Sequence, residues 1–192
     1  MASILCIIIA VLLGSISSAW VIVFLFSRKN ISSSPDGKIS PATVHRMLGV
    51  FPFALAALMD ILLAAAAVLI AKAITNSDIL AGLAGIAAMI GHNWSVFFKF
   101  KGGQGATSMC GAIAAFMFWP LLCGLAVAAI TVALTRKTTF ATAVGVVAVC
   151  IFALLVFDRG IASLYPLIFL GIMMVKRYQL AHSAKQKGSV TK

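Results

Sequence analysis

The chain divides into long apolar runs separated by short polar connections, a pattern that excludes a soluble fold. Hydrophobic residues make up 62% of the 192 residues and charged residues only 10%, and the mean hydropathy is +1.13. A soluble domain of this size needs a large solvated shell, which this composition cannot supply. We therefore predict one integral membrane domain over residues 1–192, with an all-α fold.

The fourth apolar run decides how many membrane spans are expected. It covers residues 106–134, more than the roughly 20 residues that one crossing needs, and it contains Pro120. Proline removes a backbone donor and disfavours helix at the residue before it, so we expect the run to break there. The seven predicted spans are residues 3–26, 50–74, 79–98, 106–118, 120–135, 138–157 and 161–175.

The basic residues orient these spans. The chain has 15 Lys and Arg against four acidic residues, for a net charge of +11. With the N-terminus outside and seven spans, all of the basic residues except Lys72 and Arg159 fall on the inner side, which the positive-inside rule favours. We therefore expect an outer N-terminus and a cytoplasmic C-terminus. Nucleic-acid binding is not expected, because the basic residues lie in short pieces between spans.

Four weaker signals concern structure. Ser40-Pro41 predicts the start of a short interfacial helix that runs through Leu48. The small residues 14–18 resemble a helix-packing face. Asp60 falls in the middle of a span, where a carboxyl group needs a partner, such as a serine or threonine on a neighbouring helix or a cation at the site. The tail from Lys176 is polar and basic, and we expect it to fray.

The glycine-rich segment after the third span is the strongest functional signal. Gly102, Gly103 and Gly105 allow positive φ angles, so that backbone N–H groups can converge on an anion, and a helix start follows them. Lys99 and Lys101 add full positive charges. Spacing alone leaves two interpretations open, an anion cradle and a plain tight turn. The cysteines show no metal-ligand spacing, so we predict no metal and no cofactor.

Two further side chains at the inner face are candidates. His92 lies about two turns before the glycines, and an ionisable residue at membrane depth is costly enough to suggest a role. It could act as a general base toward a hydroxyl, or it could hold a hydrogen bond between helices. Thr139, at the start of the sixth span, could offer its hydroxyl to a phosphate.

The segment from Gly91 to Gly105 resembles the motif Gly-His-x-x-(Pro/Ser)-x-x-x-x-Phe-Lys-Gly-Gly-Lys-Gly of the bacterial acyl-phosphate:glycerol-3-phosphate acyltransferases. The matching residues are Gly91, His92, Ser95, Phe100, Lys101, Gly102, Gly103 and Gly105. Weaker matches are residues 13–16, Arg46 with the three residues after it, and Asp60. The resemblance covers most of the chain and implies a seven-span fold in the bacterial inner membrane.

The resemblance also implies a reaction, acyl transfer from acyl-phosphate to the 1-hydroxyl of glycerol 3-phosphate. Lys101, the three glycines and Arg46 would bind phosphate, with Lys38 and Thr139 beside them, and His92 would be catalytic. The acyl chain would enter from the membrane lipids. Several family residues are replaced: Asp36 stands for a serine, Lys38 for an asparagine, Gln104 for a lysine and Leu180 for an asparagine.

These replacements keep other functions open. The chain could be a non-catalytic relative that binds an anionic lipid or phosphate. A small seven-span transporter is a third hypothesis, which the buried Asp60 and a broken helix fit loosely, although the two halves of the chain are not alike.

Overall fold

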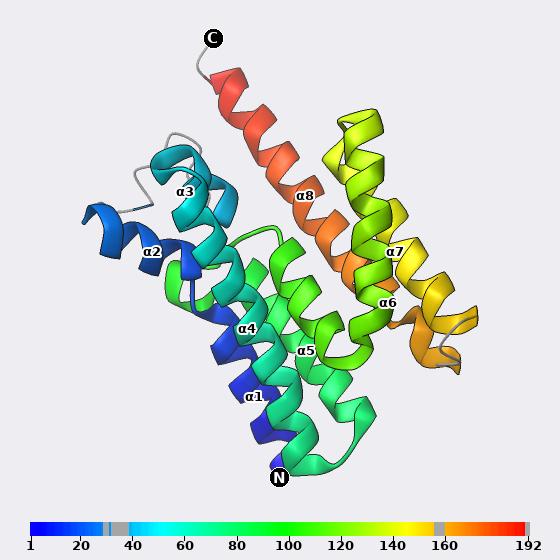
Figure 1. Ribbon diagram of the computed structural model, residues 1–192. Helices are drawn as coiled ribbons and strands as arrows, with labels where there is room; N and C mark the ends of the chain where they lie inside the picture. The colour runs from blue at the N-terminus through cyan, green and yellow to red at the C-terminus, as the bar shows by residue number, and fades with distance from the viewer. Residues whose placement is uncertain (29–30, 32–38, 156–159, 191–192) are drawn as a thin grey trace.

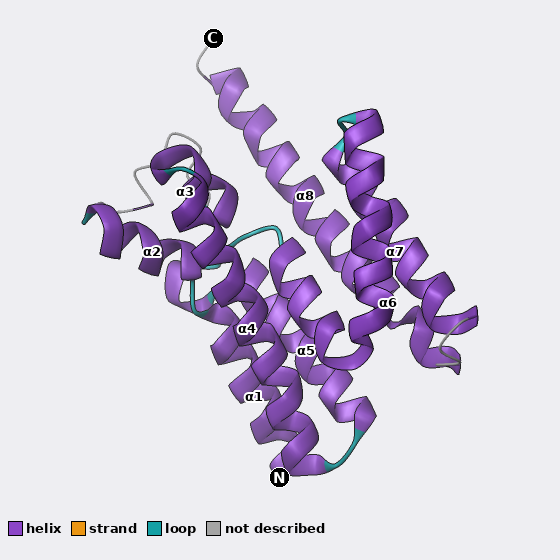
Figure 2. Ribbon diagram, in the orientation of Figure 1, coloured by secondary structure: helices purple, strands orange, loops and turns teal. Residues whose placement is uncertain are grey.

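The computed structural model describes residues 1–28, 31, 39–155 and 160–190. Within these ranges every regular element is a helix, as predicted (Figure 2). Asp36 and Lys38 lie outside the described residues. The N-terminus and the end of the last helix stand at opposite ends of the molecule (Figure 1).

The first apolar run forms two helices instead of the predicted single span. Helix α1 covers Ala2–Ser15 and α2 covers Ser18–Ser27, which turns aside from the line of α1 (Figure 1). Ser17 causes the break, because its side chain accepts a hydrogen bond from Trp20 N at 3.2 Å and so caps a new helix. Gly14 confirms the predicted packing face: a Cβ there would lie 2.0 Å from the Ala88 carbonyl oxygen.

The short helix predicted after Ser40 is present as α3, Pro41–Leu48. Gly49, at φ 92°, turns the chain directly into α4, Val50–Thr75. Val44 of α3, Val23 of α2 and Ala56 of α4 are buried together in a small core at this end of the molecule, and Phe98 packs against them. This core brings α3 close to the segment that leads into the glycines.

The third predicted span ends earlier than expected. Helix α5 covers Asp78–Asn93 and is followed by a turn and the 3₁₀ helix η2, Val96–Phe98. The residues 99–105 then form a loop without helix, drawn in teal in Figure 2. His92 and Asn93 therefore lie in the last turn of α5, close to this loop.

Helix α6, Ala106–Thr135, is interrupted as predicted, but at Met117 (φ −141°, ψ 59°) and not at Pro120. Proline cannot donate a backbone hydrogen bond to the residue four positions before it, and its ring clashes with that carbonyl group, so the helix breaks about one turn upstream of Pro120. Gly111 of the first leg packs on the Ile61 carbonyl of α4, whereas Gly124 of the second leg packs on Gly145 of α7. The two legs run in opposite directions and meet at the break (Figure 1).

The remaining elements are α7, Thr138–Leu155, the 3₁₀ helix η3, Gly160–Leu164, and α8, Tyr165–Val190. The expectation that the tail frays from Lys176 is wrong, because α8 continues as a helix to Val190. Packing explains the first part of this extension, since Lys176 is buried and Arg177 is half-buried against neighbouring elements.

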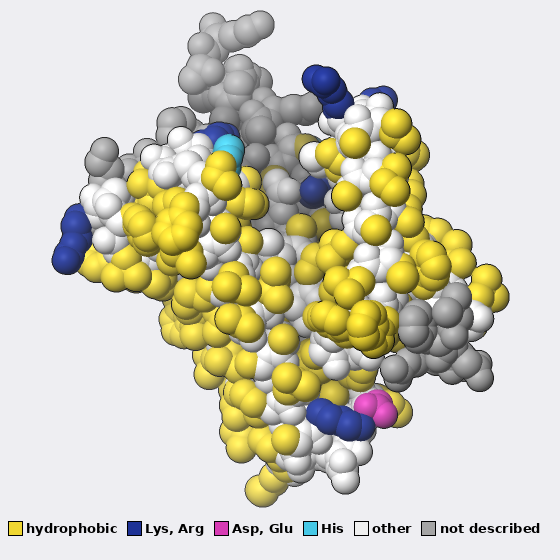
Figure 3. Space-filling model, in the orientation of Figure 1, with side chains coloured by type: hydrophobic (Ala, Val, Ile, Leu, Met, Phe, Trp, Pro, Cys, Tyr) yellow, Lys and Arg dark blue, Asp and Glu magenta, His cyan; other side chains and the backbone are white. Residues whose placement is uncertain are grey.

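The chain is a multi-pass membrane protein. Five helical segments of the described chain are long and apolar enough to cross a membrane, at Ala2–Ser27, Val50–Thr75, Asp78–Phe98, Ala106–Thr135 and Thr138–Leu155. Apolar side chains cover the middle of the molecule in Figure 3, and basic side chains gather at the end that carries α3. The opposite end shows a pair of opposite charges, which Lys72 and Asp78 form at 2.6 Å.

Candidate active site at the glycine loop

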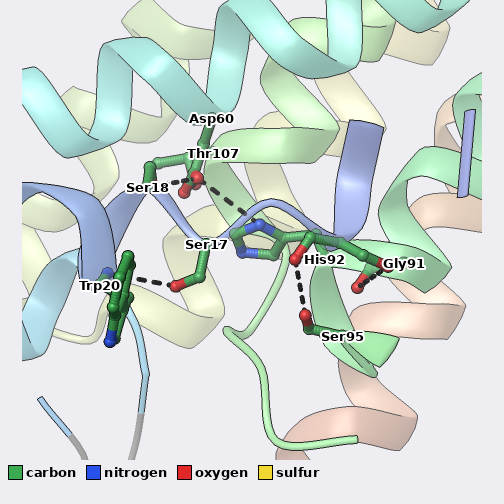
Figure 4. A network of polar contacts seen from close by, with 9 residues as sticks. Ser17, Ser18, Trp20, Asp60, Gly91, His92, Ser95 and Thr107 are labelled. Carbon is green, nitrogen blue, oxygen red and sulfur yellow. Dashed lines mark hydrogen bonds and ion pairs between the residues drawn. The ribbon is translucent and has the colours of Figure 1, made fainter. Parts of the chain in front are cut away.

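The centre of the site is Asp60, which is buried in the middle of α4. Its Oδ2 accepts a hydrogen bond of 2.7 Å from the Thr107 hydroxyl, and its Oδ1 accepts one from the Ser18 hydroxyl. Ser18 opens α2 and Thr107 lies in the first turn of α6, so one carboxyl group ties three helices together (Figure 4). The prediction that Asp60 bonds a serine or threonine on another helix is confirmed.

His92 joins this group from α5. Its Nδ1 lies 3.6 Å from Asp60 Oδ1, a distance too long for a hydrogen bond but within ion-pair range if the imidazole is protonated. The side chain is 8% exposed, so its surroundings fix the ring. Its other nitrogen, Nε2, faces the glycine loop, because a Cβ on Gly103 would lie 2.3 Å from it. We call Asp60, His92, Ser18 and Thr107 the polar node.

The glycine loop, residues 99–105, is folded directly onto the end of α5. Gly103 N donates to the His92 carbonyl oxygen at 3.1 Å. A Cβ on Gly102 would lie 2.1 Å from the same oxygen, and one on Gly105 would lie 2.6 Å from Asn93 Oδ1. Real Cβ atoms do not approach so closely. Glycine is therefore needed at all three positions for close packing.

This packing corrects one reason given for the glycines. Only Gly105 of the three has a positive φ, at 79°, and it precedes the first residue of α6. The other left-handed residues of the loop are Lys99 and Phe100, with φ of 51° and 62°. Non-glycine residues adopt this region at a cost and need support from their surroundings. At positions 102 and 103, glycine provides space and not an unusual backbone angle.

The other predicted residues are spread over the same end of the molecule. Lys101 is exposed in the loop. Arg46 is exposed on α3, where its Nε donates to the Ala42 carbonyl at 3.4 Å. Thr139, in the first turn of α7, accepts a hydrogen bond from Arg177 Nη1. Lys38 lies outside the described residues. The structure thus brings His92 and the glycines together, whereas Arg46 lies on α3 and Thr139 lies on α7.

Sequence reasoning missed two sets of contacts around the loop. Ser95 Oγ donates to the Ser15 carbonyl at 2.6 Å, which ties the start of the loop segment to α1. Trp94 receives Lys176 over its ring and donates to Gln179 from α8. Burial lowers the pKa of the Lys176 amine below its usual value. No sequence spacing indicates either contact, because the partners are more than 75 residues apart in the chain.

The arrangement suits electrostatic binding of an anion. Amides of the loop and of the first turn of α6 lie beside Lys99 and Lys101, and a helix start favours negative charge. The cavity between the loop, His92 and residues 14–19 has a volume of about 10 Å³, room for one water molecule. The space behind the loop therefore has no room for a group larger than one water molecule.

Comparison with known proteins gives a consistent result. The family model described as glycerol-3-phosphate acyltransferase matches residues 4–187. A glycerol-3-phosphate acyltransferase of Shouchella clausii (strain KSM-K16) is 31% identical over 88% of this chain and 84% of its own length. Glycerol-3-phosphate acyltransferase 2 of Bacillus anthracis is 29% identical over 93% of each chain.

Solved structures agree on the fold. The crystal structure of PlsY (YgiH), an integral membrane glycerol 3-phosphate acyltransferase, in its glycerol 3-phosphate form superposes with a TM-score of 0.80. It is 22% identical, over 97% of this chain and 94% of that chain. A second form of the same protein, with lysophosphatidic acid, gives a TM-score of 0.79 at 23% identity.

Proposed function

Because the chain belongs to the glycerol-3-phosphate acyltransferase family, we propose that it acylates the 1-hydroxyl of glycerol 3-phosphate, with acyl-phosphate as the donor. The products are lysophosphatidic acid and inorganic phosphate, and the reaction is the first step of phospholipid synthesis. The observation that carries the proposal is the fit of Gly102 and Gly103 onto His92 and Asn93, which holds the family's glycine motif in one fixed shape.

The chemistry requires little from the protein besides binding. The hydroxyl oxygen of glycerol 3-phosphate forms a bond to the acyl carbonyl carbon while the bond from that carbon to the phosphate oxygen breaks. Phosphate departs with the bonding electrons and takes up the hydroxyl proton, so that the step balances without a further reactant. Acyl-phosphate is a mixed anhydride and already activated, so holding two anions close together and neutralising them accounts for most of the catalysis.

The described residues supply this neutralisation through charge and amides. Lys101, the amides of Gly102 and Gly105 and the start of α6 bind phosphate in this proposal, because Gly103 N already donates to the His92 carbonyl oxygen. Arg46, Thr139 and Lys38, which lies outside the described residues, complete the binding surface. The family's loop lysine is Gln104 here, so Lys99 and Lys101 carry the positive charge of the loop. The acyl chain enters sideways from the membrane lipids. No metal or cofactor takes part.

His92 had two possible roles, base and loop support, and its surroundings favour the second. The ring is buried between Asp60 and Gly103, where a bound hydroxyl has no room. Replacement by glutamine tests this assignment, because an amide can keep a polar contact but cannot act as a base at neutral pH. Retained turnover in His92→Gln would indicate that His92 supports the loop. A loss as deep as that of His92→Ala would indicate that His92 acts as the base.

The membrane arrangement is proposed as follows. The two legs of α6 each count as a crossing, which gives seven with α1, α4, α5, α7 and α8, all in one domain. The N-terminus and the Lys72–Asp78 pair face outward, and the basic end faces the cytoplasm of a bacterial cell. Single cysteines at positions 1 and 137, probed with an impermeant thiol reagent in intact cells, test this orientation. Labelling at position 137 would contradict it.

Turnover of the purified protein tests the function. Phosphate release should require acyl-phosphate and glycerol 3-phosphate together, and it should fall to background when either is left out. Gly171 offers a matched control, because a Cβ there meets no atom within 4 Å. Gly171→Ala should keep wild-type turnover. Release that does not depend on glycerol 3-phosphate would contradict the proposal.

The non-catalytic alternative is favoured by the four replaced family residues, Asp36, Lys38, Gln104 and Leu180. Under that alternative the protein binds an anionic lipid or phosphate without turnover. Expression in cells that lack their own acyltransferase separates the two functions. Restored growth excludes the alternative, whereas phosphate binding without growth supports it.

A further inference from the structure

The indole of Trp94 joins the glycine-loop segment to the last helix. Its Nε1 donates to Gln179 Oε1 at 3.2 Å, and the Lys176 ammonium lies 4.9 Å from the centre of its ring. Lys176 and Gln179 are three residues apart and so share one face of α8. One turn of α8 therefore contacts the ring edge with an amide and the ring face with a cation. We call these three residues the indole joint.

Lys176 is a buried cation to which no described residue offers a carboxylate. Only 5% of the residue is exposed. Of the acidic residues that the structure describes, Asp60 contacts Ser18, Thr107 and His92, and Asp78 contacts Lys72. The ring of Trp94 is thus the partner that the described contacts give to this charge. A desolvated ammonium held over an indole fixes the two elements in one relative position.

The position of Trp94 connects this joint to the site. Trp94 is two residues after His92, and its backbone N–H donates to the Ile90 carbonyl at 2.8 Å. Ser95, the next residue, donates to the Ser15 carbonyl of α1. The glycine loop starts four residues later with the left-handed pair Lys99 and Phe100. A loop with such a backbone keeps its shape only where its ends are held.

A neighbouring face of α8 contacts Thr139, another residue that we predicted to bind substrate. Arg177 Nη1 donates to the Thr139 hydroxyl in the first turn of α7. Two adjacent residues of α8 thus contact the loop segment on one side and α7 on the other. The spacing between the glycine loop and Thr139 therefore depends on how α8 is seated.

We propose that Lys176 is a positioning residue, which acts through Trp94 to hold the glycine loop in the shape and place that bind phosphate. The proposal rests on the proposed function for the identity of the ligand, glycerol 3-phosphate. Lys176 itself does not touch substrate in this account. Its loss loosens the cradle and weakens binding in the ground state and the transition state alike.

Steady-state kinetics of two substitutions test this role. In Lys176→Met, which keeps the length of the stem and removes the charge, KM for glycerol 3-phosphate should rise about fivefold to tenfold, with kcat within about twofold of wild type. Lys176→Arg, which can also stack a cation on the indole, should restore KM to within about twofold. Lys72→Met, at the other end of the molecule, is the control and should leave both constants unchanged.

A double-mutant cycle separates positioning from direct substrate contact. If Lys176 acts through the ring, Lys176→Met should add little to KM in a Trp94→Leu background. An equally large rise in both backgrounds would mean that Lys176 contacts the substrate, and it would overturn the proposal. A lower unfolding temperature with unchanged KM would also overturn it, because the joint would then serve stability only.

A wild-type protein without turnover would defeat the proposed function but still leave a test of the joint. The readout is then the rise in unfolding temperature that inorganic phosphate produces in detergent. The proposal expects this rise in the wild type and in Lys176→Arg, and its loss in Lys176→Met. The same rise in all three proteins, or none in the wild type, would count against the joint.

Discussion

Two aspartates with polar partners stand at different depths of this molecule and show how differently the same side chain can act. Asp78 is the first residue of α5, where its side chain is 75% exposed and pairs with Lys72 at 2.6 Å. Asp60 has no exposed side chain and contacts Ser18, Thr107 and His92, of which only the imidazole, at 3.6 Å, can be charged. The shorter ion pair is the one at the surface.

The shorter distance does not mark the more important interaction, because Asp60 is buried and Asp78 is exposed. An exposed pair replaces interactions that both groups would make with water and so contributes little. A buried carboxyl group has no water to return to, so each lost partner leaves a polar atom unsatisfied. Asp60 also connects α2, α4, α5 and α6 at the point where the glycine loop is packed. We therefore expect stability and site geometry to depend on Asp60 and to be nearly independent of Asp78.

The largest effect is expected from Asp60→Ala. Removing the carboxyl group leaves the hydroxyls of Ser18 and Thr107 and the ring of His92 without their shared partner, at a cost of about 3–5 kcal/mol. Asp78→Ala should cost about 1 kcal/mol or less. Unfolding temperatures of both variants in the same detergent measure the contrast. Equal shifts in the unfolding temperatures of the two variants would contradict this contrast between Asp60 and Asp78.

The next effect concerns the loop that rests on the node. Gly102→Ala places a Cβ 2.1 Å from the His92 carbonyl oxygen, a backbone atom that cannot turn aside. We expect a loss of about 1–3 kcal/mol from this overpacking, together with a higher KM for glycerol 3-phosphate. Gly171→Ala should be neutral or slightly stabilising, because alanine suits a helix better than glycine. If Gly102→Ala behaved like Gly171→Ala, the close packing would be refuted.

A smaller effect is expected within the polar node, from the two hydroxyl groups that donate to Asp60. Ser18→Ala removes one of the two hydroxyls that donate to Asp60 and leaves Thr107 in place, so the loss should be about 1 kcal/mol. Thr107→Val should have a similar cost. The double variant should cost more than the sum, because the carboxyl group then has no hydroxyl partner. Strict additivity, measured by unfolding temperature, would mean that the two contacts are independent.

The smallest effect is expected at the exposed pair of Lys72 and Asp78. Lys72→Met should change stability by about 0–1 kcal/mol, and this change should shrink further in high salt, because exposed charges are screened. Turnover should not change, since the pair lies at the end away from the loop. A salt-independent loss of more than 2 kcal/mol would place Lys72 among the buried interactions.

Much of the fold could be predicted from the sequence because local signals were strong. Ser40-Pro41 fixed the start of α3, and the length of the fourth apolar run with Pro120 indicated a break, found at Met117. The break at Ser17 was missed, since an apolar run with four serines can continue as one helix unless a side chain caps a new one. The tail was missed because Lys176 has a partner that only tertiary structure supplies.

The site was predicted in its residues but not in its geometry. The motif identified His92 and the glycines, and the cost of a carboxyl group in a span required a partner for Asp60. That Asp60 and His92 meet depends on how α4 and α5 pack. The need for glycine at 102 and 103 is likewise a matter of contact with α5, whereas sequence reasoning had only backbone freedom to offer. The roles of Arg46, Lys38 and Thr139 in binding phosphate stay predictions.

The central claim is that His92, fixed by Asp60, holds the glycine loop in the shape that binds phosphate. The most direct test is kcat/KM for glycerol 3-phosphate in Gly103→Ala, measured beside Gly171→Ala. A Cβ at position 103 would push against the imidazole Nε2 from 2.3 Å, so we predict a loss of about 100-fold or more, about 2.7 kcal/mol of transition-state binding. Gly171→Ala should match the wild type. Equal values for the two variants would contradict the account.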